Sequence, residues 1–377
     1  MGIPGLWKLL ESSAHVMSFK ELCLIEGPIL EYRQTGSIIM GVDAGLWMTQ
    51  CQTVFHKPHH AQMGSNPELR ALLYKLVQLV QAGVVAVFVF DGPERPAVKR
   101  GKQVKTKPHW LVKGFIEMIE IFGFYHHQAP GEADAELAYL DRLQLIDGIL
   151  TDDGDVALFG ARRIIRKMNK ANLDEITVYT SASMEEDPAV QLTQGGFLLL
   201  ALMSGGDYNT VGVPGCGIGV AHALARCGFG DSLLEACNSP VIDLALFLPG
   251  WRKGIRKALV TNSRGYLQSR KLALARKIDS TFPDTSVLDL YTHPTTSWSP
   301  GFSIPAFDSW IIKVPDLANL AKYCHEKFGW SSNVIKTKFE KSLYPSLFVR
   351  RLTMPLDVHQ QIQNHVVHGY VNDEQPQ

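Results

Sequence analysis

The 377-residue sequence lacks the features that mark membrane, secreted and disulfide-stabilised proteins. Its longest apolar run, residues 84–90, is far too short to span a bilayer, and its first residues lack the basic-then-apolar layout of a signal peptide. The six cysteines form no Cys-x-x-Cys pair and follow no regular spacing, so we expect neither a zinc knuckle nor a disulfide framework. The sequence therefore predicts an intracellular protein with no membrane partner.

A net charge is also lacking, because 37 Lys and Arg balance 37 Asp and Glu. The two signs are nevertheless segregated along the chain. Residues 92–113 hold seven basic residues against one acid, and residues 250–277 hold nine basic residues and no acid. Zero net charge speaks against a nucleic-acid partner, yet two basic segments of this kind suit a polyanion better than two merely solvated faces.

The pattern of apolar residues indicates an α/β fold. Hydrophobic residues make up 46% of the chain, which is enough for one large domain or two ordinary ones. Predicted strands alternate with predicted helices, which is typical of a mostly parallel central sheet flanked by helices. The expected strands are 37–42, 84–90, 124–127, 148–151, 162–167 and 176–179, and the expected helices are 69–82, 110–122 and 132–143.

The character of the chain changes beyond residue 198, where helical patterns dominate. We expect an α/β core over residues 1–210, with a basic arch at about 92–113. A helix-hairpin-helix module and a basic helical region should follow over 211–280, and a helical C-terminal extension over 281–377.

Seven acidic residues lie in short motifs, most of them at the ends of apolar runs, and they are the strongest functional signal. They are Asp43, Asp91, Glu132, Asp134, Asp153, Asp155 and Asp207. The carboxyl ends of parallel strands meet at one edge of a sheet, so these side chains should converge there. Such a cluster repels itself unless cations fill it, and hard oxygen ligands favour Mg²⁺, with Mn²⁺ as a substitute, over Zn²⁺.

Two ions held about 3.5–4 Å apart would suit the hydrolysis of a phosphodiester. Glu132 and Asp134 begin a predicted helix, and residues two apart on a helix lie on different faces. Both still reach the site if they occupy the first, partly open turn, where the helix dipole also favours carboxylates. We do not expect their neighbours Glu136 and Asp152 to contact a metal.

The segment 212–224 reads as a glycine-rich hairpin that opens a helix. Its residues Gly215, Gly217 and Gly219 would let backbone amides approach a phosphate at the helix N-terminus. This is the pattern of a helix-hairpin-helix module, which holds the DNA backbone without reading its sequence. We also expect a monovalent cation at this hairpin.

Five motifs together resemble those of the flap-endonuclease/xeroderma-pigmentosum-G superfamily of structure-specific nucleases. The resemblance covers at least residues 1–234, and its motifs occur in the family's order: MGIPGLW (1–7), FVFDG (88–92), PGEADA (130–135), TDDGD (151–155) and GDY (206–208). It implies that the seven carboxylates surround two metals, that Lys99 and Arg100 steer the scissile phosphate, and that Gly2 packs beside the site once Met1 is removed. Further expected DNA contacts are Arg95, Lys102, Lys105, Arg252, Lys253, Arg256 and Lys257.

Within the superfamily, residues 151–161 and 202–217 look most like the Holliday-junction resolvase branch, in a fungal version. This resemblance implies a nuclear enzyme that is a monomer in solution and pairs on a four-way junction, where it makes two symmetric nicks. It also implies cleavage of 5′ flaps and replication forks.

Several alternatives remain. A replicative-type 5′ flap endonuclease would share the chemistry and differ only in the geometry of its substrate. A non-catalytic junction scaffold would be expected to have lost a ligand, and a PIN-like ribonuclease would not need the 212–224 hairpin. An aspartyl phosphatase would need a second acid where Pro93 stands.

The aromatic residues give a weaker signal than the acids. The sequence predicts core positions, rather than base-stacking ones, for Trp7, Trp47 and Trp110. Tyr208 directly follows a predicted ligand, so its role stays open.

Overall fold

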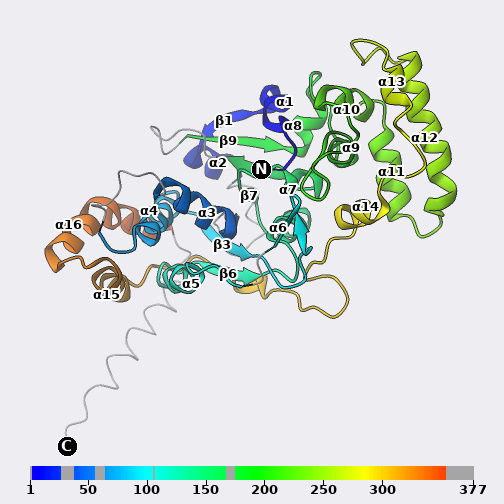
Figure 1. Cartoon of the computed structure of the whole chain (residues 1–377). Coiled ribbons are helices and arrows are strands. Elements are labelled where there is room, and N and C mark those ends of the chain that lie inside the picture. The colour runs from blue at the N-terminus through cyan, green and yellow to red at the C-terminus, as the bar shows by residue number, and fades with distance from the viewer. Residues whose placement is uncertain (1, 27–37, 56–63, 105–106, 167–174, 354–377) are drawn as a thin grey trace, which may run out of the picture.

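The computed structural model describes residues 2–26, 38–55, 64–104, 107–166 and 175–353. The described residues form a seven-stranded sheet in the order β1-β9-β8-β7-β2-β3-β6, together with a separate two-stranded hairpin, β4-β5 (Figure 1). The strands are β1 (His15–Ser18), β2 (Ile39–Asp43), β3 (Val85–Phe90), β4 (Val98–Lys99), β5 (Lys102–Gln103), β6 (Tyr125–Gln128), β7 (Gly148–Leu150), β8 (Arg163–Arg166) and β9 (Glu175–Thr180).

The centre of the sheet is parallel, as the sequence predicts. Strands β8, β7, β2, β3 and β6 run in one direction, whereas β9 is antiparallel to β8, and β1 is antiparallel to β9. All six residues of β3 are buried, because helices cover both faces of the sheet. The strand ends directly before Asp91, so the parallel arrangement delivers acids to one edge.

Helices of the first two hundred residues cover the sheet on both sides (Figure 1). They are α1 (Leu6–Leu9), α2 (Phe19–Glu26), α3 (Ala44–Phe55), α4 (Pro67–Gln81), α5 (Val112–Ile121), α6 (Ala133–Arg142), α7 (Asp155–Leu158), α8 (Ser181–Glu186) and α9 (Gln194–Ser204), with a 3-10 turn at Glu11–Ser13. Alternate residues of β3 enter different cores: Val87 belongs to the core that includes α6 and α9, and Phe88 to the core that includes α3, α4 and α5.

The later helices form two groups. They are α10 (Ile218–Ala225), α11 (Phe229–Asn238), α12 (Leu244–Thr261), α13 (Leu272–Ala275), α14 (Thr285–Thr292), α15 (Leu317–Phe328), α16 (Ser332–Ser342) and α17 (Tyr344–Thr353), with a 3-10 turn at Phe307–Ser309. Helices α10 to α13 gather beside α9, at the upper right of Figure 1. None of the described helices combines the length and the apolar character needed to cross a bilayer.

Helices α15 to α17 return to the α/β core instead of standing apart from it. Their apolar residues share one core with α4 and α5, and the Tyr323 hydroxyl donates to the carbonyl of Gly114 in α5 at 2.9 Å. The side chain of Gln81, at the end of α4, donates to the carbonyl of Ser342 at 2.9 Å. Part of the predicted C-terminal extension therefore completes the layer on this face of the sheet.

Candidate active site

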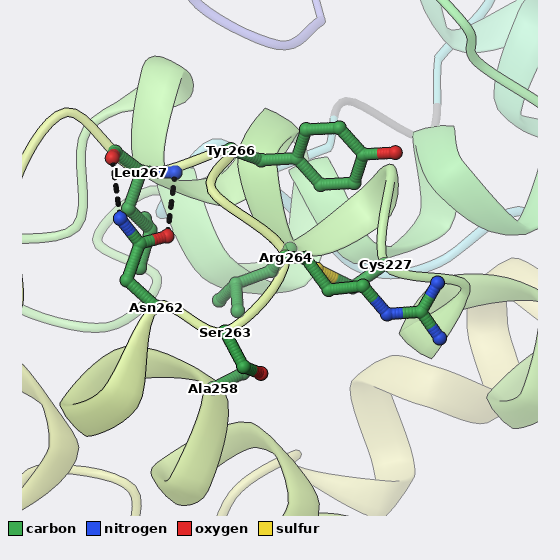
Figure 2. Close-up of a pocket in the computed structure, with 8 residues that line it drawn as sticks. Cys227, Ala258, Asn262, Ser263, Arg264, Tyr266 and Leu267 are labelled. Carbon is green, nitrogen blue, oxygen red and sulfur yellow. Dashed lines mark hydrogen bonds between the residues drawn. The ribbon is translucent and has the colours of Figure 1, made fainter.

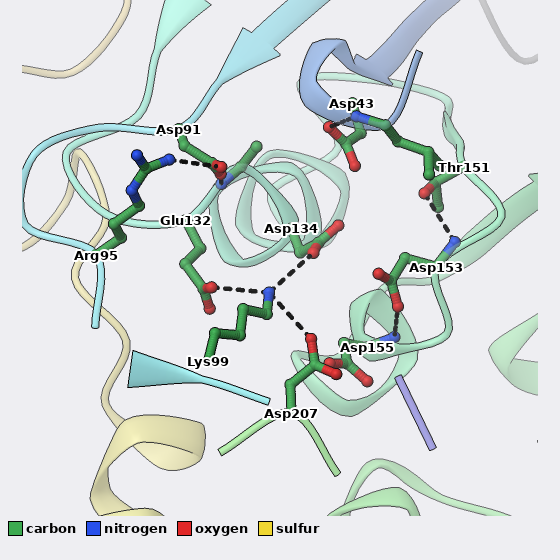
Figure 3. A network of polar contacts seen from close by, with 12 residues as sticks. Asp43, Asp91, Arg95, Lys99, Glu132, Asp134, Thr151, Asp153, Asp155 and Asp207 are labelled. Carbon is green, nitrogen blue, oxygen red and sulfur yellow. Dashed lines mark hydrogen bonds and ion pairs between the residues drawn. The ribbon is translucent and has the colours of Figure 1, made fainter. Parts of the chain in front are cut away.

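The acids of β2 and β3 lie side by side at the carboxyl edge of the sheet (Figure 3). Asp43 is the last residue of β2, and its Oδ1 accepts a hydrogen bond from Leu46 N at 2.9 Å, at the start of α3. Asp91 follows β3, and its Oδ1 accepts from Ala133 N at 2.9 Å. Parallel pairing thus brings together two carboxylates that are 48 positions apart in the sequence.

The first turn of α6 carries two more acids to the same place. Glu132 is the residue that caps α6, with extended backbone angles, and Asp134 lies in its first turn. Lys99 Nζ lies 2.8 Å from Glu132 Oε1 and 3.9 Å from Asp134 Oδ2, so both side chains reach one centre. The partly open first turn of α6 thus lets both acids point toward the same centre, as predicted.

Asp153 lies in the loop that follows β7, Asp155 begins α7, and Asp207 follows α9. Within the loop, Asp153 N donates to Thr151 Oγ1 at 3.0 Å, and Asp155 N donates to Asp153 Oδ1 at 3.3 Å. Arg100 joins the loop to Asp207. Its guanidinium donates to both oxygens of Asp207, at 2.7 Å each, and lies 3.4 Å from Asp153 Oδ2.

The β4-β5 hairpin places its basic residues inside the acidic cluster. Lys99 Nζ contacts three acids, including Asp207 Oδ2 at 3.2 Å (Figure 3). Arg100 has a positive φ of 55°, which turns the hairpin tightly, and its backbone N donates to the carbonyl of Asp207 at 2.6 Å. The hairpin is therefore fixed to the site through both its backbone and its side chains.

Burial and mutual repulsion make ionisation of several of these acids unfavourable. Burial, followed by the charges of Asp91 and Asp153, raises the pKa of Asp43 to about 7. Burial and neighbouring carboxylates also raise the pKa values of Asp134 and Asp155 well above the usual range. This cluster needs positive charge to hold it together.

In Asp207 and Lys99, close pairing with opposite charges favours the ionised form instead. Burial opposes ionisation of Asp207, but the hydrogen bonds and charges of Arg100 and Lys99 hold its pKa below the ordinary value. Burial likewise opposes the charge on Lys99, yet Asp134, Glu132 and Asp207 raise its pKa well above the ordinary value. Lys99 is therefore a fixed cation within the site.

The donor set of the cluster fits hard divalent cations. All seven side chains are carboxylates, and the buried atoms Asp134 Oδ1 and Asp155 Oδ1 have no hydrogen-bond partner. Oxygens of this kind are costly to bury unless a cation meets them. Within the described part of the chain, no three His, Cys, Asp or Glu side chains already surround one point closely enough to hold a metal ion. The side chains of Lys99 and Arg100 lie between the carboxylates instead.

The glycine at position 2 lies against the same acids. A Cβ atom added to Gly2 would lie 2.3 Å from Asp155 Oδ1 and 2.9 Å from Asp153 Oδ1, and its φ of 77° is one that other residues rarely adopt. The start of the chain therefore forms one wall of the site, as the resemblance implies, and only glycine fits there without strain.

Tyr208, whose role the sequence left open, holds one of the acids in place. Its hydroxyl donates to Glu132 Oε2, and its ring packs on Tyr291 with centroids 4.5 Å apart. Burial, followed by the charge of Glu132, raises the pKa of Tyr208, so its hydroxyl keeps the proton that it donates. Its position directly after Asp207 was the signal in the sequence.

Glu136 and Asp152 contact residues outside the cluster. Glu136 is fully buried, where it contacts His127 Nε2 at 2.9 Å and accepts a hydrogen bond from Ser297 N at 2.9 Å. Asp152 accepts from Gln50 Nε2 at 3.0 Å and pairs with Arg166 at 3.1 Å. Both acids hold the elements that carry the candidate ligands, and periodicity in the sequence gave no sign of the Ser297 contact.

The glycine-rich hairpin presents an open backbone to solvent. Gly215, Gly217 and Gly219 are exposed, and a Cβ added at Gly217 or Gly219 would meet no atom within 4 Å. Gly217 caps α10 with no side-chain hydrogen bond to the first turn, and the first amides of a helix have no partner within the helix. Lys277 Nζ donates to the carbonyl of Pro214 at 2.7 Å, which brings a further cation beside this hairpin.

Three of the four predicted basic contacts on α12 are exposed. They are Lys253, Arg256 and Lys257, whereas Arg252 is half-buried and its Nε donates to the carbonyl of Phe282. Figure 2 shows the turn that follows α12, where the Asn262 side chain bonds both N and O of Leu267. The same turn carries Arg264 over a small hollow beside Cys227. This end of the molecule therefore combines the basic residues of α12 with a hydrogen-bonded turn that carries Arg264.

The remaining predicted contacts are placed as follows. Arg95 Nη1 pairs with Asp91 Oδ2 at 3.0 Å, at the mouth of the site. Lys102 is exposed on β5, opposite Lys99 in the hairpin. Lys105 lies outside the described residues.

One prediction about the tryptophans is wrong. Trp47 is buried and Trp7 packs on the core, as expected, but the Trp110 side chain is 59% exposed. The sequence predicted a helix from residue 110, whereas α5 begins only at Val112, so Trp110 precedes the helix and is exposed.

Comparison with known proteins places this arrangement in a family. A model of the XPG N-terminal domain matches residues 1–109, and a model of the XPG I-region matches residues 123–207. A solved structure described as the Holliday junction-resolving enzyme GEN1 in complex with product DNA and Mg²⁺ is 32% identical, with a TM-score of 0.72. The alignment covers 93% of this chain and 80% of that one. The chain belongs to the XPG superfamily of nucleases.

Other members of the superfamily agree with this placement. A GEN-1 structure described as a eukaryotic junction-resolving enzyme binding caesium is 32% identical, with a TM-score of 0.74, over 93% of this chain and 79% of that one. The mouse protein named flap endonuclease GEN homolog 1 is 30% identical over 271 residues, which is 66% of this chain and 28% of that protein. This chain thus spans little more than a quarter of the length of that curated relative.

Proposed function

We propose that this chain is a Mg²⁺-dependent, structure-specific DNA endonuclease that resolves four-way junctions by paired, symmetric nicks. The observation that carries the proposal is the convergence of seven carboxylates from five separate segments on one edge of the sheet. The similarity to a junction-resolving enzyme over 93% of the chain supports the choice of substrate. Mapping the nicks made in an immobile four-way junction tests it.

The seven carboxylates are the residues that would hold two divalent cations, Mg²⁺ or Mn²⁺. When bound, these ions would supply a nucleophilic water at neutral pH and stabilise the leaving oxygen. The protein orients the carboxylates: Leu46 N holds Asp43, Ala133 N holds Asp91, and the Tyr208 hydroxyl holds Glu132. Gly2 leaves room beside Asp155 that any side chain would fill.

Lys99 and Arg100 would exchange partners when DNA arrives. Without DNA they neutralise Asp207, Glu132 and Asp153. A phosphodiester at the site offers the same two side chains an anion to bind, which frees the carboxylates for metal. The two basic residues then hold the scissile phosphate in place for attack.

The DNA arms would leave the site across the glycine-rich hairpin and α12. The exposed residues Gly217 and Gly219, at the start of α10, suit a phosphate group, and we keep the expectation of a monovalent cation at this hairpin. The solved GEN-1 structures include one that binds caesium, which supports this expectation. The contact would extend along the DNA backbone through Lys253, Arg256 and Lys257.

Neutralising α12 should weaken DNA binding without stopping the chemistry. In a Lys253→Gln, Arg256→Gln, Lys257→Gln variant, the slope of log affinity against log salt should fall by about 0.9 for each phosphate that is no longer bound. Fluorescence anisotropy over a range of salt concentrations measures this slope. The matched control is Lys336→Gln, which removes an exposed Lys from α16. A slope unchanged in the triple variant would mean that α12 is only a solvated face.

Two symmetric nicks need two active sites, so we propose that the chain is a monomer in solution and pairs on the junction in the nucleus. The alternative function is that of a replicative-type 5′ flap endonuclease, because a relative is named a flap endonuclease and the chemistry is the same. We expect cleavage of 5′ flaps and replication forks as a secondary activity.

A further inference from the structure

The exposed residue Trp110 forms an aromatic surface together with His109. The two rings stack with centroids 5.9 Å apart and an interplanar angle of 28°. His109 Nδ1 accepts a hydrogen bond from Leu111 N at 3.3 Å, and Leu111 itself is buried in the core. We call His109 and Trp110 the aromatic platform. An indole that is left in water forgoes the burial that normally stabilises tryptophan.

The aromatic platform lies at the same edge of the sheet as the acidic cluster. The end of α5 meets the start of β6, where Phe124 N donates to Ile119 O at 3.0 Å. Strand β6 runs parallel to β3 toward the catalytic edge, so α5 runs back and its first residues lie at that edge. Phe115 of α5 packs on Phe90, the residue before Asp91, with ring centroids 6.1 Å apart. Trp110 comes five positions before Phe115, directly ahead of α5, and so at the end of the helix that lies at this edge.

The charge around the aromatic platform fits a nucleic acid. Lys107 and Lys113, which precede and follow it in the sequence, are exposed, and the sequence has no acid between Glu94 and Glu117. Stacking rings flanked by cations are the combination that binds an unpaired base through its ring and its strand through the phosphates. A protein partner with an apolar surface would not need the two lysines.

We propose that the aromatic platform stacks on a nucleobase that the branch point of a DNA junction leaves without a stacking neighbour. The inference rests on the proposed function, because only a branched substrate offers such a base beside the scissile phosphate. A continuous duplex keeps its bases stacked along its length. The aromatic platform therefore adds selectivity for branched DNA to the sequence-independent grip of the basic residues.

The test compares Trp110→Ala and Trp110→Phe with the wild-type full chain. Fluorescence anisotropy gives the Kd for an immobile four-way junction and for a linear duplex of the same length, in Ca²⁺ to prevent cutting. Trp110→Ala should bind the junction roughly tenfold more weakly and the duplex unchanged, and Trp110→Phe should retain most of the affinity. Phe348→Ala, which removes an exposed aromatic from α17, should change neither Kd. 2-Aminopurine at the branch point should be quenched by the wild type and not by Trp110→Ala.

The outcomes separate this inference from the proposed function. A wild-type protein with no preference for the junction would contradict the proposed function and this inference together. If the wild type prefers the junction and Trp110→Ala keeps the full preference, only the inference fails. It also fails if Trp110→Ala binds junction and duplex equally weakly, because that result reports a general interaction with DNA.

Discussion

Asp153→Asn should lower the rate of junction cleavage by about a thousandfold or more and leave DNA binding intact. Asp153 lies within the carboxylate cluster, where its Oδ2 contacts Arg100 and its Oδ1 orients the loop toward Asp155. Removing one charge from a metal ligand costs several kcal/mol of transition-state stabilisation, which corresponds to about that factor in rate. The basic residues that bind phosphates stay in place, so the Kd for the junction should not rise. Single-turnover cleavage and anisotropy on the same substrate measure the two quantities.

The neighbouring acid provides a matched control for this variant. Asp152→Asn makes the same change one position earlier, on a side chain that points away to Gln50 and Arg166. Its cleavage rate should stay within about tenfold of wild type. Equal losses in the two variants would mean that the loop, and not a ligand, had been damaged, and weaker DNA binding in Asp153→Asn would count against its assignment as a metal ligand.

Lys99→Met should have two opposite effects, slower cleavage and tighter binding of metal in the absence of DNA. The ammonium of Lys99 lies 2.8 Å from Glu132 and 3.2 Å from Asp207, so it competes with a divalent cation for the same oxygens. Without it, Mn²⁺ should bind more tightly, because the remaining carboxylates repel one another more strongly. The single-turnover rate should nevertheless fall about a hundredfold, since one cation that holds the transferring phosphate is gone. Electron paramagnetic resonance titration with Mn²⁺ and rapid-quench cleavage measure the two effects.

Lys102 lies opposite Lys99 in the β4-β5 hairpin and is exposed, so Lys102→Met is the matched control. At saturating enzyme its cleavage rate should stay within about threefold of wild type, and its Mn²⁺ affinity should not change. Weaker binding of Mn²⁺ to Lys99→Met would contradict the exchange of partners proposed for this hairpin.

The sequence predicted the parallel centre of the sheet and the gathering of the acids for a simple physical reason. A strand buried on both faces, such as β3, shows as a continuous apolar run, and the residue that follows it must lie at the edge. Glu132 and Asp134 were predicted together because the first turn of a helix is geometrically open. In each case a pattern of neighbouring residues in the sequence determines where the acidic side chain lies.

What the sequence did not predict depends on contacts between distant segments. Tyr323 reaches Gly114 across 209 positions, and Ser297 meets Glu136 across 161 positions, and neither pair leaves a periodic signal. The insertion of Lys99 and Arg100 among the acids depends on a tight turn at a residue with positive φ. The sequence predicted the start of α5 two residues too early, and Trp110, predicted in the core like the other large aromatic residues, precedes the helix and is exposed.

The measurement that tests the account most directly is a map of the nicks that the full chain makes in Mg²⁺ in an immobile four-way junction, beside a matched 5′ flap. Every strand is labelled in turn, and Asp153→Asn is run in parallel. The account predicts paired, ligatable nicks at symmetric positions on two opposing strands of the junction, absent in Asp153→Asn and in EDTA. Cutting of the flap while the junction stays whole would make the chain a flap endonuclease, and metal-dependent cutting of neither substrate would contradict the account.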